Sequence, residues 1–449
     1  MKYQIIFICF LTYSMNLYAG NGLLIPGYGK NASMSGAGVA HPQDALIGSV
    51  NSAGSVWVGD RIDFTNDVYY LNGGYEISNN NRNPLDIGTA YETLGVIGDD
   101  HPVESVRSKL KFLDLPSLGI VKQLNDKLAI GLAIYGTGLS VRYDRDDTTE
   151  IFPNNFFGKT FNGTFFDGTT AVELQVVNSN WHVSYKITDK ASIGGGINLA
   201  AQSFRAKGLG ALRFISQGEI GEWDRDIDLG IGWNLGVQTE VIPNMTFGAS
   251  YYSKIELQHD KYDGLFAEGD LSLPAQWTVG ISINIKPKHT VNIDIQKIYW
   301  SKLTTTGNKL TDIFNTGFDI TQAIDFTGNF LINPFGSDNN AGFGFSDSTV
   351  YKIGYQFELD ALPTWTWRFG YSYQSQIIPE NGTLFAVLSP GAIQKHYSFG
   401  FSKTFWKDYE ASFTTIYTGK SEVKGAGLSA GVDVYMEQFS MGFGLAMKF

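Results

Sequence analysis

The chain has 449 residues, only 17% of them charged, with a formal net charge of −11. This acidic balance, with no basic cluster in the sequence, argues against nucleic acid as a partner. The counts of 23 Tyr, 31 Phe and 52 Gly are unusual for a helical enzyme and typical of a membrane β-barrel. Composition alone also admits a soluble, secreted all-β protein, so the order of the residues has to decide.

Residues 1–19 have the features of a cleaved export signal. Lys2 supplies the positive start, residues 5–11 form a short apolar stretch, and residues 17–19 give a cleavage site. The only cysteine, Cys9, lies in this segment, so the mature chain offers neither a disulfide nor a thiolate metal site. No later apolar run approaches the roughly 20 residues of a transmembrane helix.

Residues 20–57 are rich in Gly, Ala and Ser and lack the alternation of a strand. A disordered periplasmic tail is one interpretation. However, Leu23, Leu24, Ile25 and Pro26 would be costly to leave in water, and small residues suit close packing inside a lumen. We therefore expect this segment, called the hatch below, to plug a barrel formed by residues 58–449.

The rest of the chain alternates apolar and polar residues with a period of two, as residues 229–238 illustrate. Short breaks fall between paired strands, near residues 125–127, 188–190, 242–245, 286–289, 360–363 and 406–409. They alternate with long polar stretches at 75–112, 142–169, 208–227, 260–273, 301–347, 379–394 and 421–430. This rhythm predicts an all-β fold, a transmembrane antiparallel barrel of about 14 strands with short periplasmic turns and long external loops.

The last predicted strand, residues 439–449, places apolar side chains at every second position and ends in Phe449. Soluble proteins avoid such an apolar edge, whereas a barrel in lipid closes it by pairing with the first strand. We expect this strand to close the barrel, to face outer-membrane lipid and lipopolysaccharide, and to present Phe449 to the barrel-assembly machinery.

Deletion of Phe449 is therefore expected to lower the amount of folded protein in the outer membrane. The measurement is the heat-dependent gel shift of isolated outer membranes. Replacement of Phe449 by tryptophan, which keeps a terminal aromatic ring, is the matched control. Normal folding and yield after the deletion would contradict the closing-strand prediction.

Several segments resemble the FadL-type outer-membrane transporters of long-chain fatty acids and hydrocarbons. Residues 27–54 resemble the family's N-terminal hatch, whose Asn-Pro-Ala ending corresponds to Asn51-Ser52-Ala53, followed by Gly54. Residues 229–257 and 273–303 are similar to two of its hairpins, and residues 365–380 to a strand with a proline-containing tail. The resemblance implies a fourteen-stranded, plugged barrel that passes hydrophobic ligands by diffusion across the bacterial outer membrane.

The same resemblance implies a capture groove built from two neighbouring external loops. The corresponding loops here contain the apolar residues Leu212, Phe214, Ile215, Leu265 and Phe266. A second interpretation is that these side chains only pack the loops against the barrel. The hatch residues 23–26 are expected to reach the ligand pocket.

Two cations are predicted to face the lumen, because each lies between outward aromatic or aliphatic residues. Lys352 and Arg368 would bind a ligand carboxylate, since charge-assisted hydrogen bonds are strong. The alternative pairs both with lumen carboxylates such as Glu240 or Glu256.

A lateral exit is expected at Gly136, Thr137 and Gly138. Apolar residues occupy the even positions of 128–134, and the pattern then resumes at Leu139 on the opposite phase. Glycines within a strand mark bulges or close backbone approach, and a bend at the external rim is the simpler explanation. In the FadL family a kinked strand at this place opens the barrel wall.

No catalytic or cofactor site emerges from the sequence. The six histidines lack zinc-ligand spacing, and no G-x-S-x-G motif is present. We therefore expect no enzyme activity, no metal and no cofactor. Two other functions stay open, a general diffusion porin with an open lumen and a structural or adhesive barrel that acts through its loops.

Overall fold

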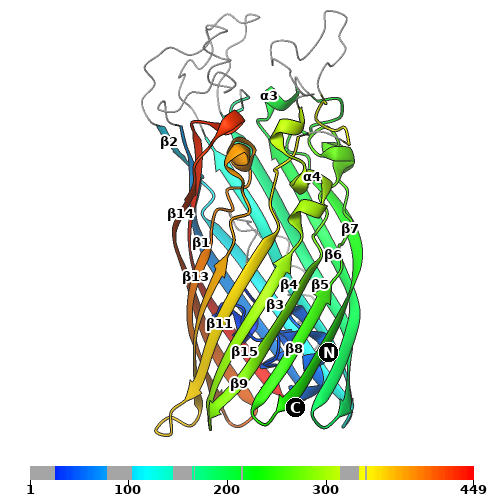
Figure 1. Cartoon of the computed structure of the whole chain (residues 1–449), viewed down its shortest axis with the longest axis vertical. Coiled ribbons are helices and arrows are strands. Elements are labelled where there is room, and N and C mark those ends of the chain that lie inside the picture. The colour runs from blue at the N-terminus through cyan, green and yellow to red at the C-terminus, as the bar shows by residue number, and fades with distance from the viewer. Residues whose placement is uncertain are drawn as a thin grey trace, which may run out of the picture.

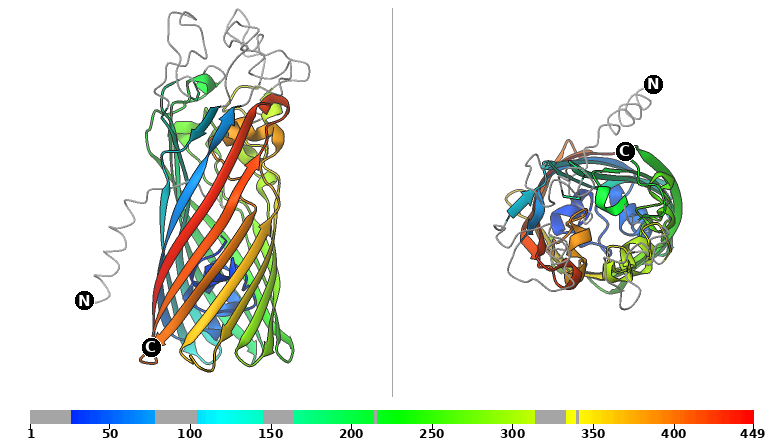
Figure 2. Two further views of the ribbon diagram at one scale, coloured as in Figure 1. Left: turned by 90° about the vertical axis from the view of Figure 1, so that its left-hand side faces the viewer. Right: turned by 90° about the horizontal axis from the view of Figure 1, so that it is seen from above.

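The computed structural model of the chain describes residues 26–77, 104–144, 164–165, 167–213, 216–313, 333–338 and 341–449. It is a tall, closed β-barrel with the hatch inside one end and the long loops gathered at the other (Figures 1 and 2). The predicted signal segment, residues 1–19, lies outside the described residues.

The wall consists of fourteen antiparallel strands, each paired with its sequence neighbours, and the short β2 (Glu104–Arg107) extends the end of β1 only. The fourteen are β1 (Arg61–Ile77), β3 (Phe112–Asn125), β4 (Leu128–Tyr143), β5 (Thr170–Thr188), β6 (Ala191–Lys207), β7 (Asp226–Ile242), β8 (Met245–Tyr252), β9 (Gln276–Lys286), β10 (His289–Ile298), β11 (Ser348–Glu358), β12 (Trp365–Gln374), β13 (Lys395–Phe405), β14 (Tyr409–Val423) and β15 (Val432–Lys448).

The barrel closes through β15, as the sequence predicts. Its ladder with β1 runs without a register shift from Arg61 opposite Lys448 to Ile77 opposite Val432. Closure satisfies the backbone hydrogen bonds of both terminal strands, which a lipid environment requires.

Alternation along each strand separates a lipid face from a lumen face. On β7, Leu229 and Leu235 are 75% and 58% exposed on the outer wall, whereas Asn234 between them is 1% exposed. Because successive side chains of a strand point to opposite faces, this single pattern builds an apolar belt outside and a polar lumen inside.

The six turns between paired strands are short and lie at the hatch end, and all six match the predicted breaks. Asn244 and Lys288 adopt positive φ in two of them. The loop after β8 begins earlier than predicted, at residue 253 instead of 260, because beyond Tyr252 the chain forms only isolated bridges, such as Ile255 with Leu273.

Short helical turns in the loops fold over the open end of the barrel (Figure 1). They are α3 (Gly210–Arg213), η5 (Asp260–Tyr262), η6 (Ala267–Gly269), η7 (Trp300–Lys302), α4 (Thr304–Gly307), η8 (Leu310–Ile313), η10 (Glu380–Gly382), α5 (Thr383–Ala386) and η11 (Gly427–Ser429). None of the helices in the described ranges is long and apolar enough to cross a bilayer.

The described part of the hatch, residues 26–57, lies within the lumen, which confirms the predicted plug (Figure 2). It contains three 3₁₀ turns: η2 (Gly29–Met34), η3 (Ala45–Ser49) and η4 (Ser52–Trp57). The side chains of Asp44 and Asn51 cap η3 and η4 by accepting hydrogen bonds from the N–H groups of Leu46 and Ala53.

Candidate functional site

An outer cavity of about 90 Å³ lies beneath the folded loops. Its wall is largely apolar and includes the predicted ligand residues Leu265 and Phe266, together with Leu139, Val172, Leu174, Val176, Phe204, Leu271, Leu273, Trp300, Phe343, Phe345 and Leu388. A cavity with this lining accepts apolar groups and offers few hydrogen bonds.

The loop between β8 and β9 brings Leu265 and Phe266 into this cavity. The hydroxyl of Tyr262 accepts a hydrogen bond from the N–H of Ala206 at 2.9 Å and donates to the carbonyl of Asp224 at 2.8 Å. The ring of Phe266 then packs against Phe204, with 5.0 Å between centroids. These contacts draw the loop inward and hold it over the lumen.

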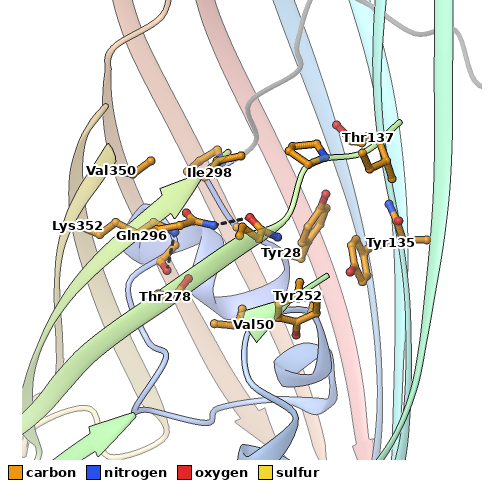
Figure 3. Close-up of a pocket in the computed structure, with 18 of the residues that line it drawn as sticks. Tyr28, Val50, Tyr135, Thr137, Tyr252, Thr278, Gln296, Ile298, Val350 and Lys352 are labelled. Atoms are coloured by element: carbon orange, nitrogen blue, oxygen red, sulfur yellow. Dashed lines mark hydrogen bonds between the residues drawn. The ribbon is translucent and has the colours of Figure 1, made fainter. Parts of the chain in front are cut away.

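A second, inner cavity of about 220 Å³ lies between the outer cavity and the hatch (Figure 3). Thr137, Leu273 and Trp300 line both cavities, so the two spaces adjoin along the barrel axis. The inner wall is more polar, with Tyr28, Asn178, Asn198, Gln276, Gln296, Lys352, Gln374 and His396 among its residues. Pro26, the one described residue of the predicted 23–26 segment, also lines it.

Three polar side chains in the inner cavity have few hydrogen-bond partners or none. Lys352 is only 9% exposed, and its ammonium donates to the carbonyl of Gly36 at 3.5 Å. Gln374 Nε2 and His396 Nε2 have no hydrogen-bond partner among the described residues. Buried donors of this kind favour a ligand that brings acceptor oxygens.

Lys352 does face the lumen, but its carboxylate neighbour is not one that the sequence suggested. Asp294 lies directly opposite Lys352 in the β10–β11 ladder, and it accepts hydrogen bonds from the N–H groups of Gly38 and Val39 at 2.7 and 2.9 Å. Glu240 and Glu256 instead pair with Lys190 and Lys254. The two partners named from the sequence are therefore wrong, because both glutamates lie at the exposed edges of the barrel, whereas the lumen carboxylate opposite Lys352 is Asp294.

Arg368 also points inward, but it contacts the hatch and lines neither cavity. Its Nε donates to Gln43 Oε1 at 2.7 Å and to Gln356 Oε1 at 2.9 Å, and its Nη1 donates to the hydroxyl of Ser402 at 3.1 Å. In the described structure Arg368 thus supports the hatch at the short-turn end of the barrel.

Buried ion pairs anchor the hatch beside Arg368. Lys30 Nζ lies 2.5 Å from Glu410 Oε1 on β14, and Arg61 on β1 pairs with Asp63 at 2.7 Å. The backbone N–H of Lys30 donates to Asp44 at 2.7 Å. Burial lowers the pKa of Lys30, and nearby Arg61 lowers it further, whereas Glu410 raises it. Separation of this pair would leave an unpaired buried charge, which is strongly unfavourable.

The predicted hatch residues hold the C-terminal part of the plug. The Asn51 side chain donates to the carbonyls of Val39 and Val237 at 2.8 and 3.1 Å and accepts from the N–H of Ala53 at 3.1 Å. A Cβ at Gly54 would lie 2.6 Å from Ile47, so only glycine fits there. Ser52, which stands where the family has proline, donates a hydrogen bond to Asn234.

Sequence reasoning missed the contact between Ser55 and His182, whose Oγ and Nε2 atoms are 2.6 Å apart. The imidazole sits between two glycines, since a Cβ at Gly48 or Gly131 would lie 2.3 or 2.2 Å from a ring atom of His182, and a Cβ at Gly196 would lie 2.7 Å from the Cα and Cβ of His182. The glycines of the 193–197 segment were one available signal for this close approach of β6 to a bulky inward ring.

The barrel wall has a stretch where β3 and β4 are not paired. Their ladder ends at Leu118 opposite Ile134, although β3 begins at residue 112 and β4 continues to residue 143. The chain just before β3 contacts β4 again where the N–H of Lys109 donates to the carbonyl of Arg142 at 2.8 Å. We call residues 112–117 and 135–141 the unpaired wall segment.

Pro116 lies in this segment, where its lack of an N–H group is tolerated because no neighbouring strand requires that hydrogen bond. It was a second signal in the sequence for the unpaired wall segment. The β4–β5 register is continuous from Leu128 to Tyr143, so no bulge explains the change of apolar phase after Gly136. Leu139 is instead buried inside, beneath the loops, while Gly136 keeps the outward phase.

The hatch contacts the unpaired wall segment directly. The hydroxyl of Tyr28 donates to the carbonyl of Gly136 at 3.2 Å, and the rings of Tyr28 and Tyr135 are 4.6 Å apart (Figure 3). Thr137 and Gly138 line the outer cavity, and Thr137 lines the inner one as well. Both cavities therefore reach the same part of the wall.

The remaining predicted ligand residues do not join these cavities. Leu212 lies in α3 and is buried in the apolar cluster beneath the loops, without lining either cavity. Leu23, Leu24, Ile25, Phe214 and Ile215 lie outside the described residues. Within the described ranges no group of three or more His, Cys, Asp or Glu side chains is arranged to hold a metal ion.

The family model described as "Outer membrane protein transport protein (OMPP1/FadL/TodX)" matches residues 112–449. Outer membrane protein P1 of Haemophilus influenzae is 23% identical over 332 residues, which span 63% of this chain and 64% of that protein. The match therefore covers less than two thirds of this relative.

Several solved structures share the fold. The Pseudomonas putida toluene transporter TodX superposes with a TM-score of 0.62 at 17% identity, covering 95% of this chain and 99% of that one. A Pseudomonas aeruginosa FadL homologue gives a TM-score of 0.57 at 16% identity, with 95% and 99% coverage. The chain therefore belongs to the OMPP1/FadL/TodX family of outer-membrane transport proteins, which confirms the predicted location and the expectation that it is not an enzyme.

Proposed function

We propose that this protein takes up hydrophobic compounds by diffusion, through the outer cavity, the inner cavity and then sideways through the barrel wall. The observation that carries this proposal is the continuity of the two cavities with the unpaired wall segment, at Thr137. The hatch lies buried in the lumen below the inner cavity, on the straight path to the periplasm, which supports this route over an open porin.

A lateral exit is also favourable on energetic grounds. A hydrophobic ligand that left through the hatch would enter water, at a cost of about 25 cal/mol for each Å² of apolar surface exposed. On the inner side of the unpaired wall segment, Leu113 and Leu115 pack with Tyr69 and Leu71 in a buried apolar cluster. An exit here leads from one apolar surface to another and on into lipid.

We propose that the preferred ligand is a long-chain fatty acid or a similar amphiphile with one anionic end. The carboxylate would bind Lys352, Gln374 and His396 in the inner cavity, while the chain would extend into the apolar outer cavity. Cavities of about 150 Å³ hold benzene, so an inner cavity of about 220 Å³ also has room for a small aromatic hydrocarbon. TodX is a toluene transporter, and such a ligand would lack the interaction with Lys352.

Replacement of Lys352 by methionine tests this assignment. Hydrogen bonds to charged groups contribute about 1.5–3 kcal/mol, so fatty-acid affinity is expected to fall by about tenfold or more, while toluene affinity stays the same. Titration of the purified protein in detergent, at a pH where the ligand is ionised, measures both affinities.

Lys395→Met, which removes an exposed lysine on β13, is the matched control. Equal losses for oleate and toluene in Lys352→Met would mean that the cavity has collapsed, and the assignment would fall. Unchanged oleate affinity in Lys352→Met would likewise show that the Lys352 ammonium does not bind the ligand.

We also propose that the barrel-assembly machinery recognises β15, the strand that ends next to Phe449. The backbone N–H of Phe449 donates to the carbonyl of Asp60 at 3.1 Å, and Lys122 Nζ lies 5.2 Å from the centre of its ring. These contacts join the strand end to the start of β1 and to β3 once the barrel has closed.

A further inference from the structure

The outer wall carries a cationic cluster at the loop end of β5, β6 and β7, three strands that lie side by side (Figure 1). Arg205 faces outward on β6, directly opposite Glu173 of β5, and Lys207 follows two residues later on the same face. Arg225 immediately precedes β7 and reaches the same carboxylate.

Two of the three cations in this cluster contact one carboxylate. Arg205 Nη2 lies 2.7 Å and Arg225 Nη2 3.4 Å from Glu173 Oε2, and Arg225 Nη1 donates to the hydroxyl of Ser203 at 2.6 Å. Lys207 forms no ion pair with any described residue. The side chains of Arg205, Lys207, Arg225 and Glu173 therefore sum to a net charge of +2, and the exposed Asp224 next to Arg225 lowers the local excess to about +1.

An indole ring orders these cations. Trp223 adopts a positive φ of 71°, and its N–H donates to the carbonyl of Ala206 at 2.8 Å. This turn lays the ring across the outer face of β6, with the guanidinium carbon of Arg205 at 4.1 Å and Lys207 Nζ at 5.3 Å from the ring centre. A stacked arginine loses less conformational freedom on binding an anion.

The apolar belt begins directly below the cluster. Ile227 and Leu229, the next outward residues of β7, are 63% and 75% exposed. Among the other described cations at the loop end, Arg142 is neutralised by Asp144 and Lys420 by Glu76 and Glu422. Lys297 on β10 and Lys395 on β13 form no ion pair with a described residue, but each is a single lysine on its strand. Among the described residues, the cluster on β5–β7 thus combines excess positive charge with an adjoining apolar surface.

We propose that Arg205, Lys207 and Arg225 bind the phosphate of a phosphorylated lipid in the outer leaflet. The long loops of such barrels face the cell exterior, so the cluster lies at the headgroup level of that leaflet. The cations bind the phosphate through charge-assisted hydrogen bonds, while the acyl chains lie along Ile227 and Leu229. The apolar surface below is the reason to assign a lipid and not a free phosphate ion.

The test compares the purified full-length protein with the double variant Lys207→Gln, Arg225→Gln. Arg205 is kept, because its removal would leave Glu173 buried without its close partner. The matched control is Lys297→Gln with Lys395→Gln, which removes the same charge from the loop ends of β10 and β13. Native mass spectrometry in detergent measures bound diphosphorylated lipid A.

We expect the double variant to bind lipid A about tenfold or more weakly, whereas the control binds like the unmodified protein. Dephosphorylated lipid A should bind the unmodified protein as weakly as the phosphorylated form binds the double variant. Unchanged binding in the double variant, or tight binding of the dephosphorylated lipid, would overturn the proposal. Displacement by an equal concentration of inorganic phosphate would assign the site to the free anion and overturn the lipid assignment.

Discussion

Gly136→Val combined with Gly138→Phe is expected to reduce uptake of hydrophobic compounds to background while the barrel assembles normally. A Cβ at Gly136 would lie 3.4 Å from Leu115 Cδ2, so the larger side chains fill the space between β4 and β3 in the unpaired wall segment. Accumulation of radiolabelled oleate and toluene in cells measures uptake, and the heat-dependent gel shift reports assembly.

A matched control places the same two residues on the same outward face of β4. Ile130→Val with Leu132→Phe lies where the ladder with β3 is intact, with Lys122 and Ile120 opposite. This variant is expected to transport normally. If the Gly136 and Gly138 variant also transports normally, the exit does not lie at this place.

Deletion of residues 20–57 is expected to convert the protein from a nearly closed barrel into a steady open pore. Barrels of 16 to 18 strands leave an aqueous channel, so fourteen strands without a hatch should raise single-channel conductance by roughly an order of magnitude. Planar-bilayer recording of the intact and shortened proteins measures the difference. A large, steady conductance of the intact protein would show that the hatch does not seal the lumen.

A disulfide tether separates sealing from transport. The hydroxyl oxygens of Ser35 in the hatch and Ser398 on β13 are 2.8 Å apart, so cysteines at both positions lie within bonding reach. The oxidised Ser35→Cys, Ser398→Cys protein is expected to stay closed and to transport normally, because the proposed route does not require the hatch to leave. Transport that stops on oxidation and returns with a reductant would show that the hatch must move.

The barrel was predictable from the sequence because one local rule governs it. Along strands such as β7 and β8, outward apolar side chains alternate with inward polar or small ones. The same pattern in β15 predicts that this strand closes the barrel. The rule also gave the inward direction of Lys352 and Arg368. It carries no information about height along the barrel axis, so it could not show that Lys352 lies in the inner cavity while Arg368 contacts Gln43.

The loop contributions to the site were harder to predict, because they depend on contacts between distant residues. Leu265 and Phe266 line the outer cavity only because Tyr262 bonds to Ala206 and Asp224. The unpaired wall segment had local signals in Gly136 and Pro116. The loss of pairing between β3 and β4 depends on the register of each strand with its other neighbour. The periodicity of a single strand does not specify that register.

The buried ion pairs around Lys30 and Glu410 affect the permeability of the envelope that contains this protein. They fix the plug at the periplasmic end, while the proposed path turns aside above it near Tyr28. Ligand passage then leaves the seal against water, ions and hydrophilic toxins in place. A bacterium could make this transporter in large amounts for scarce nutrients without weakening the permeability barrier that its envelope provides.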